Sequence, residues 1–228
     1  MVTRPRKREA RKGDFRDLEA QLCRVLMKTG AIRFGLFRLS GGKLTPYYVD
    51  LRMVPGDPNG LRTVMAIYEK MVRSSIGISS FDRIAAIPTA GVPYASILAY
   101  QIAKPFLYVR RELRPHAGER KVEGQIRPGE RILLVDDLIA TGNNMRQAAE
   151  AVRAEGGRVE QVLVLIDRQE GGQAALAKAD VSLRAFMTIS DIARRLRESG
   201  IVDDEDYKSM LAQVVRSRKF PKTVGSGN

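Results

Sequence analysis

The sequence predicts an α/β protein built on a doubly wound, mainly parallel sheet with helices on both faces. The first observation is that β-type and helical patterns alternate along the 228-residue chain, as they do in βαβ units. The second is the apolar run 132–135, which suits a strand buried on both faces of a parallel sheet. The third is a pair of small-residue turns, 88–91 and 138–144, each placed between such a strand and a helix.

The N-terminal part of this domain is expected to be a helix, a hairpin and a second helix. Residues 14–28 place apolar side chains on one face, which predicts the first helix. Two β-type runs, 31–39 and 44–51, flank the Gly-containing turn 40–43, which predicts a hairpin. An Asp-Pro pair then opens a helix expected over 57–74.

The middle of the chain is expected to supply the first strands of the main sheet. A short buried strand is predicted over 83–87, followed by a helix over 93–103 and a strand over 106–109. The next twenty residues or so, 110–130, are rich in arginine and poor in apolar residues, and a loop is expected there. Loops of that length in compact domains are usually functional lids or disordered segments.

The remaining chain continues the alternation. A helix is expected after the 132–135 strand, and its buried face repeats at helical spacing: Met145, Ala148, Ala149 and Val152. Strands are predicted over 161–166 and 181–187. A helix capped by Ser190 is expected next, and a last helix over 203–218.

Length and composition indicate one globular domain with two tails. We expect a disordered basic tail over 1–13, a single domain over 14–220 and a flexible tail over 221–228. No apolar run approaches the roughly 18 residues of a membrane span. Cys23 is the only cysteine, which excludes an internal disulfide and fits a reducing compartment. A cytoplasmic protein without a membrane partner is therefore expected.

The net charge of +13 comes partly from the basic segment at the N-terminus and partly from the arginine-rich stretch 110–131. A basic excess is typical of nucleic-acid binding or of a substrate with several phosphates. Aromatic residues make up 6% of the chain and tryptophan is absent, so nothing indicates a base-stacking surface. The composition favours a polyphosphate substrate over nucleic acid.

Two adjacent carboxylates, Asp136 and Asp137, follow the 132–135 strand directly. The turn behind them opens a helix, and a helix N-terminus attracts phosphate. Carboxylates would repel a phosphate alone, but they suit ribose hydroxyls or a metal ion beside that phosphate. The pattern therefore predicts a sugar-phosphate site, and the alternative is a turn in which one aspartate only caps the helix.

Residues 131–145 resemble the signature of the phosphoribosyltransferases. Three further segments resemble the orotate phosphoribosyltransferases in particular: the hairpin 30–52, the basic loop 109–124 and the segment 166–171. The resemblance covers roughly residues 14–218. It implies the type I phosphoribosyltransferase fold, with a hood over about 14–52 plus the C-terminal helices, a core over about 58–187, and a flexible catalytic lid.

The resemblance implies transfer of the 5-phosphoribosyl group from phosphoribosyl pyrophosphate to orotate, giving orotidine 5′-monophosphate and pyrophosphate in pyrimidine (UMP) biosynthesis. The catalytic residues implied are Arg114, His116, Asp136 and Asp137. The residues implied to bind phosphoribosyl pyrophosphate are Arg110, Arg111, Arg114, His116, Asp136, Asp137, Leu138, Ile139, Ala140, Thr141, Gly142, Asn143 and Asn144. Orotate is expected to contact Ala140 and Arg168. Mg²⁺ is implied as cofactor, bound mainly through the substrate, and a homodimer shares its lids across the interface.

Several positions depart from the family pattern. Arg111 and Arg114 stand where the family usually carries lid lysines, and arginine does not readily give up a proton. Ser40, Ala90 and Ala140 also replace residues that other members place near the substrates. Two alternatives therefore remain open: transfer to another nucleobase, and a non-catalytic regulator that binds phosphoribosyl pyrophosphate.

Overall fold

The computed structural model describes residues 6–38, 42, 44–110 and 121–219. Its centre is a six-stranded sheet with the order β5-β4-β3-β6-β7-β8, in which β5 alone runs antiparallel to its neighbour. The strands are β3 (Arg83–Ala86), β4 (Phe106–Val109), β5 (Val122–Glu123), β6 (Arg131–Ile139), β7 (Arg158–Asp167) and β8 (Ser182–Thr188). The expected doubly wound, mainly parallel sheet is confirmed.

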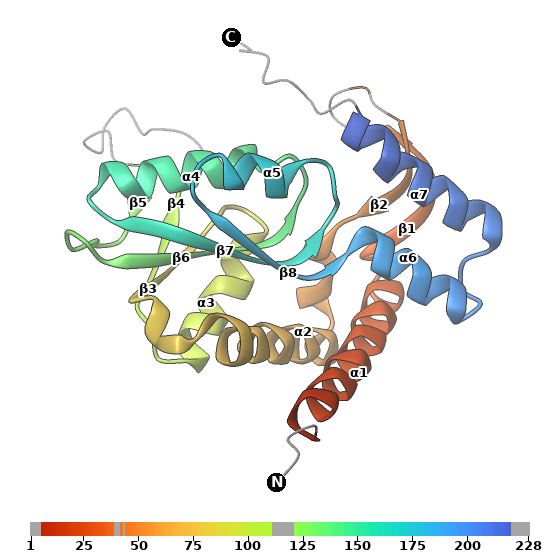
Figure 1. The fold of residues 1–228 in the computed structure, drawn as a ribbon, viewed down its shortest axis with the longest axis horizontal. Helices are drawn as coiled ribbons and strands as arrows, with labels where there is room; N and C mark the ends of the chain where they lie inside the picture. Colours follow the sequence, from red (N-terminus) through yellow and green to blue (C-terminus); the bar gives the residue numbers. More distant parts are fainter. Residues whose placement is uncertain (1–5, 39–41, 43, 111–120, 220–228) are drawn as a thin grey trace, which may run out of the picture.

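Helices cover both faces of this sheet (Figure 1). One face packs against α2 (Pro58–Met71) and α3 (Gly91–Gln101). The other packs against α4 (Asn143–Ala154) and α5 (Gly172–Ala177). The side chains of β6 show why: Leu133 and Val135 belong to the first core, whereas Ile132 and Leu134 belong to the second. Because successive side chains of a strand point to opposite faces, an apolar run without polar interruption is buried on both.

The hood is a second layer of elements at one end of the sheet, on the right in Figure 1. It contains the antiparallel hairpin β1 (Ile32–Arg38) and β2 (Leu44–Val49), with α1 (Arg6–Lys28), α6 (Ile189–Glu198) and α7 (Asp204–Lys219). Arg195 of α6 forms an ion pair with Glu19 of α1, which ties the two ends of the chain together. The 3₁₀ turn Leu51–Gly56 leads from the hairpin back into the core, and Val72–Ile76 and Ile78–Ser80 are short irregular helical turns.

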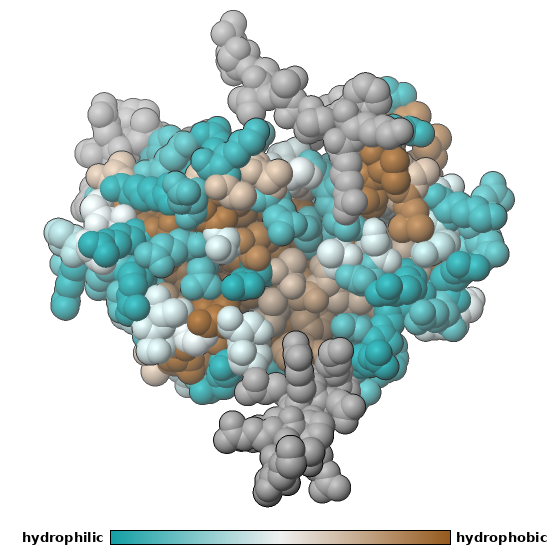
Figure 2. All heavy atoms as spheres, in the orientation of Figure 1, coloured by the Kyte–Doolittle hydropathy of each residue, from teal (hydrophilic) through white to brown (hydrophobic). Residues whose placement is uncertain are grey.

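The outer surface of the hood exposes a few large apolar side chains. Leu36 of β1, Leu44 of β2 and Val215 of α7 are exposed. Figure 2 shows hydrophobic atoms on the surface at the upper right, where the hairpin lies beside α7 in Figure 1. None of the helices in the described part of the chain has the length and apolar content needed to cross a membrane.

The structure corrects five expectations about the helices and strands. Helix α1 begins at Arg6, inside the tail 1–13 that was expected to be disordered, because the Arg, Lys, Glu and Ala residues there are good helix formers. The loop expected over 110–130 contains β5, which extends the sheet beyond β4. Helix α5 was not expected at all. It is only 6 residues long, too short for a periodic apolar pattern to be read.

The other two corrections concern caps and strand ends. Strand β6 continues through both aspartates to Ile139, because they remain paired with β7. The N-cap of α6 is Thr188 rather than Ser190. Thr188 and Asp191 form a reciprocal capping box, in which the hydroxyl accepts from the Asp191 N–H and the carboxylate accepts from the Thr188 N–H.

Candidate active site

The carboxyl ends of β3 and β6 meet the end of the hood hairpin around a cleft of about 270 Å³. This is the edge of an open α/β sheet at which ligands bind. The strand end of β6 contributes the two aspartates, the turn after β3 contributes its backbone, and the segment after β2 closes the third side. The lining residues are Val49, Asp50, Arg52, Pro88, Thr89, Ala90, Asp136, Asp137, Leu138 and Asn144.

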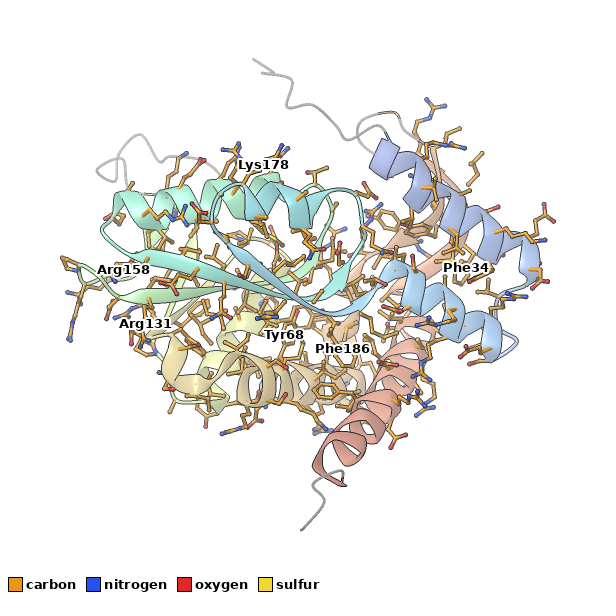
Figure 3. All side chains as sticks on the ribbon, in the orientation of Figure 1. Phe34, Tyr68, Arg131, Arg158, Lys178 and Phe186 are labelled. Atoms are coloured by element: carbon orange, nitrogen blue, oxygen red, sulfur yellow. The ribbon has the colours of Figure 1, made fainter. Side chains whose placement is uncertain are left out.

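Both aspartates are held rigidly at the edge of this cleft. Asp136 is 8% exposed and Asp137 is 7% exposed. The Asp137 N–H donates to Oδ1 of Asp136 at 2.9 Å, and the Leu138 N–H donates to Oδ1 of Asp137 at 2.8 Å. Tyr68, which lies between α2 and the sheet in Figure 3, donates its hydroxyl to the Asp136 carbonyl at 2.7 Å. These hydrogen bonds set the direction in which each carboxylate points.

Burial raises the pKa of the Asp137 carboxyl above its ordinary value. The hydrogen bonds from Asp136 and from the backbone act in the opposite direction, and the nearby Asp50 charge raises the pKa further. An ionised carboxylate in this position is therefore stabilised by any cation or hydroxyl donor that enters the cleft. That is the property expected of a site for a metal-bound sugar or a developing positive charge.

The turn after β3 packs directly against Asp136. A Cβ atom at Gly91 would lie 2.6 Å from Oδ1 of Asp136 and 2.9 Å from the Val135 carbonyl oxygen, so only glycine fits. The peptide bond between Pro88 and Thr89 is cis. The close approach of Gly91 to Asp136 brings the 88–91 turn to the same side of the cleft as the acid pair.

The turn between β6 and α4 carries the predicted phosphate site. Gly142, with a φ of +82°, is the N-cap of α4, and this left-handed conformation favours glycine. A Cβ there would lie 3.1 Å from the Gly172 carbonyl oxygen, so the turn also packs closely on α5. The first amides of an α-helix have no partner inside the helix and attract phosphate. Ala140, Thr141, Gly142 and Asn143 form this turn or the helix start, whereas the Ile139 side chain is buried in the core and does not reach the cleft.

Arg110 lies at the base of the expected lid. Its Nε is 2.5 Å from Oε1 of Glu123, which joins the end of β4 to β5. Arg110 and Lys121 line a small cavity next to the cleft, and Asn144 lines both. Positive charge is thus placed beside the turn of α4. The other predicted lid residues, Arg111, Arg114 and His116, lie outside the described residues.

Arg168 follows β7 and is not among the residues that line the cleft. It is 8% exposed, and its Nη2 lies 2.7 Å from Oε1 of Glu170. Its Cζ lies 5.7 Å from the ring centroid of Tyr47, a buried residue of the hood hairpin. Arg168 therefore sits where the hood meets the core, already paired with a carboxylate.

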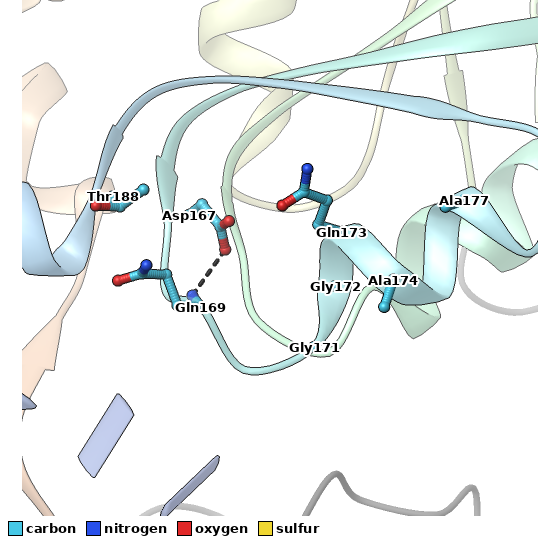
Figure 4. Close-up of a pocket in the computed structure, with 8 residues that line it drawn as sticks. All are labelled: Asp167, Gln169, Gly171, Gly172, Gln173, Ala174, Ala177 and Thr188. Carbon is cyan, nitrogen blue, oxygen red and sulfur yellow. Dashed lines mark hydrogen bonds between the residues drawn. The ribbon is translucent and has the colours of Figure 1, made fainter. Parts of the chain in front are cut away.

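A second cavity of about 400 Å³ lies between α5 and the ends of β7 and β8 (Figure 4). In it, the Gln169 N–H donates to Oδ1 of Asp167 at 2.7 Å. Alanine and glycine residues of α5 and the preceding loop form much of its wall. The smaller cleft is the candidate active site instead, because Asp136, Asp137 and Asn144 of α4 line it.

The predicted site residues do not include six residues that line the cleft: Val49, Asp50, Arg52, Pro88, Thr89 and Ala90. Oδ1 of Asp50 accepts from Nε of Arg52 at 2.6 Å, and Oδ2 accepts from Nη2 at 2.8 Å. This pairing lowers the pKa of Asp50, so its carboxylate stays ionised. The available signal was position, since Asp50 directly follows β2, and Pro88 and Thr89 come shortly after the end of β3.

Metal ligands were also considered in the described part of the chain. No group of three or more His, Cys, Asp and Glu side chains is placed there to hold a metal ion. Asp136 and Asp137 nevertheless supply the oxygen ligands that Mg²⁺ prefers, and Mg²⁺ is commonly bound by one or two carboxylates together with substrate phosphates. The donor set fits a metal that arrives with a phosphorylated substrate.

The phosphoribosyl transferase domain family matches residues 56–196. The chain therefore belongs to the phosphoribosyl transferase family. An orotate phosphoribosyltransferase of Cenarchaeum symbiosum is 40% identical over 177 residues, which are 78% of this chain and 88% of that protein. Among solved structures, the orotate phosphoribosyltransferase of Aeropyrum pernix is 32% identical with a TM-score of 0.66, over 78% of this chain and 99% of that one. The UMP synthase of Leishmania donovani is 31% identical with a TM-score of 0.77, over 87% of this chain and 42% of that longer one. Within its family, this chain groups with the orotate phosphoribosyltransferases.

Proposed function

We propose that the cleft transfers the 5-phosphoribosyl group from phosphoribosyl pyrophosphate to orotate, with release of pyrophosphate. One observation carries the proposal: the carboxylates of Asp136 and Asp137 share a cleft with Asn144, which lies in the first turn of α4. The acids suit the ribose hydroxyls, and the helix start suits the 5′-phosphate. Several relatives that are 30–40% identical bear the name orotate phosphoribosyltransferase, which supports the same activity.

The acid pair acts on the sugar. As the bond from C1 to pyrophosphate breaks, positive charge develops on the ribose. Asp136 and Asp137 hold the ribose hydroxyls and stabilise that charge, because both carboxylates are fixed by backbone hydrogen bonds before the substrate arrives. The amides of Thr141, Gly142 and Asn143 hold the 5′-phosphate at the start of α4.

The leaving pyrophosphate gains negative charge, and the basic side chains beside the cleft stabilise it. Arg110 and Lys121 lie next to Asn144 in the small adjoining cavity. In the proposed mechanism the lid closes over the site and adds the positive side chains of Arg111, Arg114 and His116. The closed lid also excludes water that would hydrolyse the activated sugar. Arginines in the lid retain the electrostatic role, whatever proton transfer lysine performs elsewhere in the family.

Mg²⁺ is the cofactor in this proposal. The Asp136 and Asp137 carboxylates and the substrate's own oxygens would hold it. When bound, it neutralises charge on the pyrophosphate and so makes it a better leaving group.

Arg168 recognises the carboxylate of orotate. A guanidinium offers two parallel N–H groups that match a carboxylate, which lysine does not. Its position between hood and core, against the Tyr47 ring, supports a role in holding the base. Ala140, whose carbonyl accepts from the Gly172 N–H at 2.9 Å, borders the same region through its backbone.

The protein acts as a cytoplasmic homodimer in this proposal, with each lid reaching the partner's site. An apolar groove between α2 and α3 supports an interface, and it is lined by Pro58, Leu61, Arg62, Met65, Ile97 and Gln101. Tyr100, the neighbour of Gln101 on α3, is 88% exposed, which is unusual for a large aromatic side chain.

A turnover assay with phosphoribosyl pyrophosphate, Mg²⁺ and one nucleobase at a time tests the proposal. Consumption of orotate with release of pyrophosphate supports it. Turnover only with another base, or tight binding of phosphoribosyl pyrophosphate without turnover of any base, contradicts it.

Arg168→Ala is expected to raise the KM for orotate at least tenfold while changing the KM for phosphoribosyl pyrophosphate less than twofold. Equal effects on both substrates would contradict the role of Arg168.

A further inference from the structure

The ion pair between Arg168 and Glu170 is among the most deeply buried in the described part of the chain. The two side chains are 10% and 9% exposed, and Nη2 of Arg168 lies 2.7 Å from Oε1 of Glu170. Tyr47, fully buried in β2, closes the pair from the hood side. Charges taken out of water are costly unless they are paired and hydrogen-bonded.

The charges of this pair neutralise each other, but several of its hydrogen-bond donors and acceptors have no hydrogen-bond partner among the described residues. In the part of the chain that the structure describes, Nε and Nη2 of Arg168, Oε1 of Glu170 and the Tyr47 hydroxyl are buried and make no hydrogen bond of normal geometry. A guanidinium has five donors and a carboxylate accepts through two oxygens. The contact between them therefore leaves donors of Arg168 unsatisfied, and an incoming carboxylate of fork geometry would satisfy them.

The loop that carries Glu170 is itself fixed. The N–H of Gln169 donates to Asp167, and its side-chain Oε1 accepts from the N–H of Ser190 at 3.2 Å and from the Ser190 hydroxyl at 2.5 Å. The residue before Glu170 is therefore anchored to both β7 and α6.

We infer that Glu170 is a specificity-determining residue: it is the counterion of Arg168 until the carboxylate of the nucleobase substrate replaces it. An anionic base is attracted by Arg168 and repelled by Glu170. The net charge of the site then limits how tightly the base and its nucleotide product are held, which favours product release. A neutral base does not displace Glu170 from Arg168, so the charge of Glu170 changes the affinity for bases that carry a carboxylate and leaves the affinity for neutral bases unchanged.

This inference rests on the proposed function, so two measurements come first: the turnover of orotate by the wild-type protein and the KM for orotate of Arg168→Ala. Failure of the wild-type protein to turn over orotate, or an unchanged KM for orotate in Arg168→Ala, overturns the proposed function and with it the role of Glu170. With both results as expected, Glu170→Gln is compared with wild type. The control is Glu69→Gln, which removes one equal charge from a surface ion pair between Glu69 of α2 and Arg73 in the turn that follows it.

Glu170→Gln is expected to lower the KM for orotate about three- to tenfold, because a repulsive charge near the bound carboxylate is removed. The KM for phosphoribosyl pyrophosphate should stay within twofold, and so should the inhibition constant of uracil, which lacks the carboxylate. The control variant should match wild type in all three. An unchanged or raised KM for orotate overturns the inference, and so does equal tightening of orotate and uracil.

A second variant keeps the test decisive if Glu170→Gln does not fold. Glu170→Asp retains the charge on a shorter side chain, which draws the carboxylate away from Arg168. The KM for orotate is then expected to fall by a smaller factor, with the other two constants unchanged. A KM for orotate equal to or above that of wild type overturns the inference.

Discussion

Gly91 and Asp136 are in such close contact that a single methyl group at residue 91 would lie 2.6 Å from the Asp136 carboxylate. Gly91 is the first residue of α3, and Asp136 lies near the end of β6. Two neighbouring parallel strands thus place their carboxyl-terminal turns in direct contact. The geometry of the acid pair depends on the backbone of a segment 45 residues earlier in the chain.

Gly91→Ala is expected to lower kcat/KM by about 10- to 100-fold, because the new methyl group displaces either the carboxylate or the start of α3. The unfolding midpoint should also fall by a few degrees, as expected for about 1 kcal/mol or more of overpacking. Steady-state kinetics and thermal unfolding measure the two effects. Gly56→Ala is the matched control, since a Cβ at Gly56 would meet nothing within 4 Å. Equal behaviour of the two variants would refute the contact.

Tyr68→Phe tests how the backbone of the acid pair is held. The variant removes the donor to the Asp136 carbonyl and leaves a buried acceptor unsatisfied, which costs about 1–3 kcal/mol. Thermal unfolding should show a midpoint lower by roughly 2–12 °C, given about 2–4 °C per kcal/mol in a chain of this size. Tyr94→Phe removes a similar bond, to the Leu51 carbonyl at 2.5 Å, and serves as control. A fall in kcat is expected for Tyr68→Phe beyond any in Tyr94→Phe, and equal kcat values would argue against a role at Asp136.

Asp137→Asn is expected to make the folded protein more stable at neutral pH and at the same time to lower its activity. Burial raises the pKa of Asp137 in the folded protein, so the protonated form is favoured by folding. Stability from this group is therefore present at low pH and is lost as pH rises through the raised folded pKa. At neutral pH the asparagine variant is expected to unfold at a higher temperature than wild type, and the difference should shrink in acid. Its kcat/KM should fall by about 100-fold or more.

The wild-type pH profile supplies the complementary measurement. In the proposed mechanism the ionised form of Asp137 acts on the sugar, so kcat/KM should decline in acid at a higher pH than an unperturbed aspartate would cause. This acidic limb should be altered in Asp137→Asn. An asparagine variant less stable than wild type at neutral pH would contradict the assigned burial cost.

Most of the central sheet could be predicted because its strands are buried on both faces. Runs such as 132–135 contain nothing but apolar residues, and that pattern has few interpretations. The acid pair could be predicted equally well, since it follows such a run directly. Its proximity to the 88–91 turn could not be predicted, because that contact depends on the order of strands in the sheet.

Local patterns failed where tertiary contacts decide. Strand β5 has only 2 residues, and its pairing with β4 gives no periodic signal. Asp50 and Arg52 could be assigned to the hairpin but not to the cleft, because the hood's placement over the sheet is set by packing among α1, α6 and α7. Arg168 was expected to be available to a ligand, whereas its pairing with Glu170 depends on how the loop after β7 turns.

Ser190 and Thr188 illustrate the same limit and give a last prediction. Both hydroxyls stand near the start of α6, and sequence alone favoured Ser190 as the cap. In the structure Thr188 is the cap, and the Ser190 hydroxyl donates instead to Gln169.

Thr188→Ala should therefore cost about 1 kcal/mol of folding stability, with an unfolding midpoint lower by about 2–4 °C and unchanged kinetics. Ser190→Ala should release Gln169 and, with it, the loop that carries Glu170, so it should alter the KM for orotate. Kinetics and thermal unfolding of both variants provide the comparison. A Ser190→Ala variant that loses helix stability with unaltered kinetics would mean that Ser190 is the cap after all.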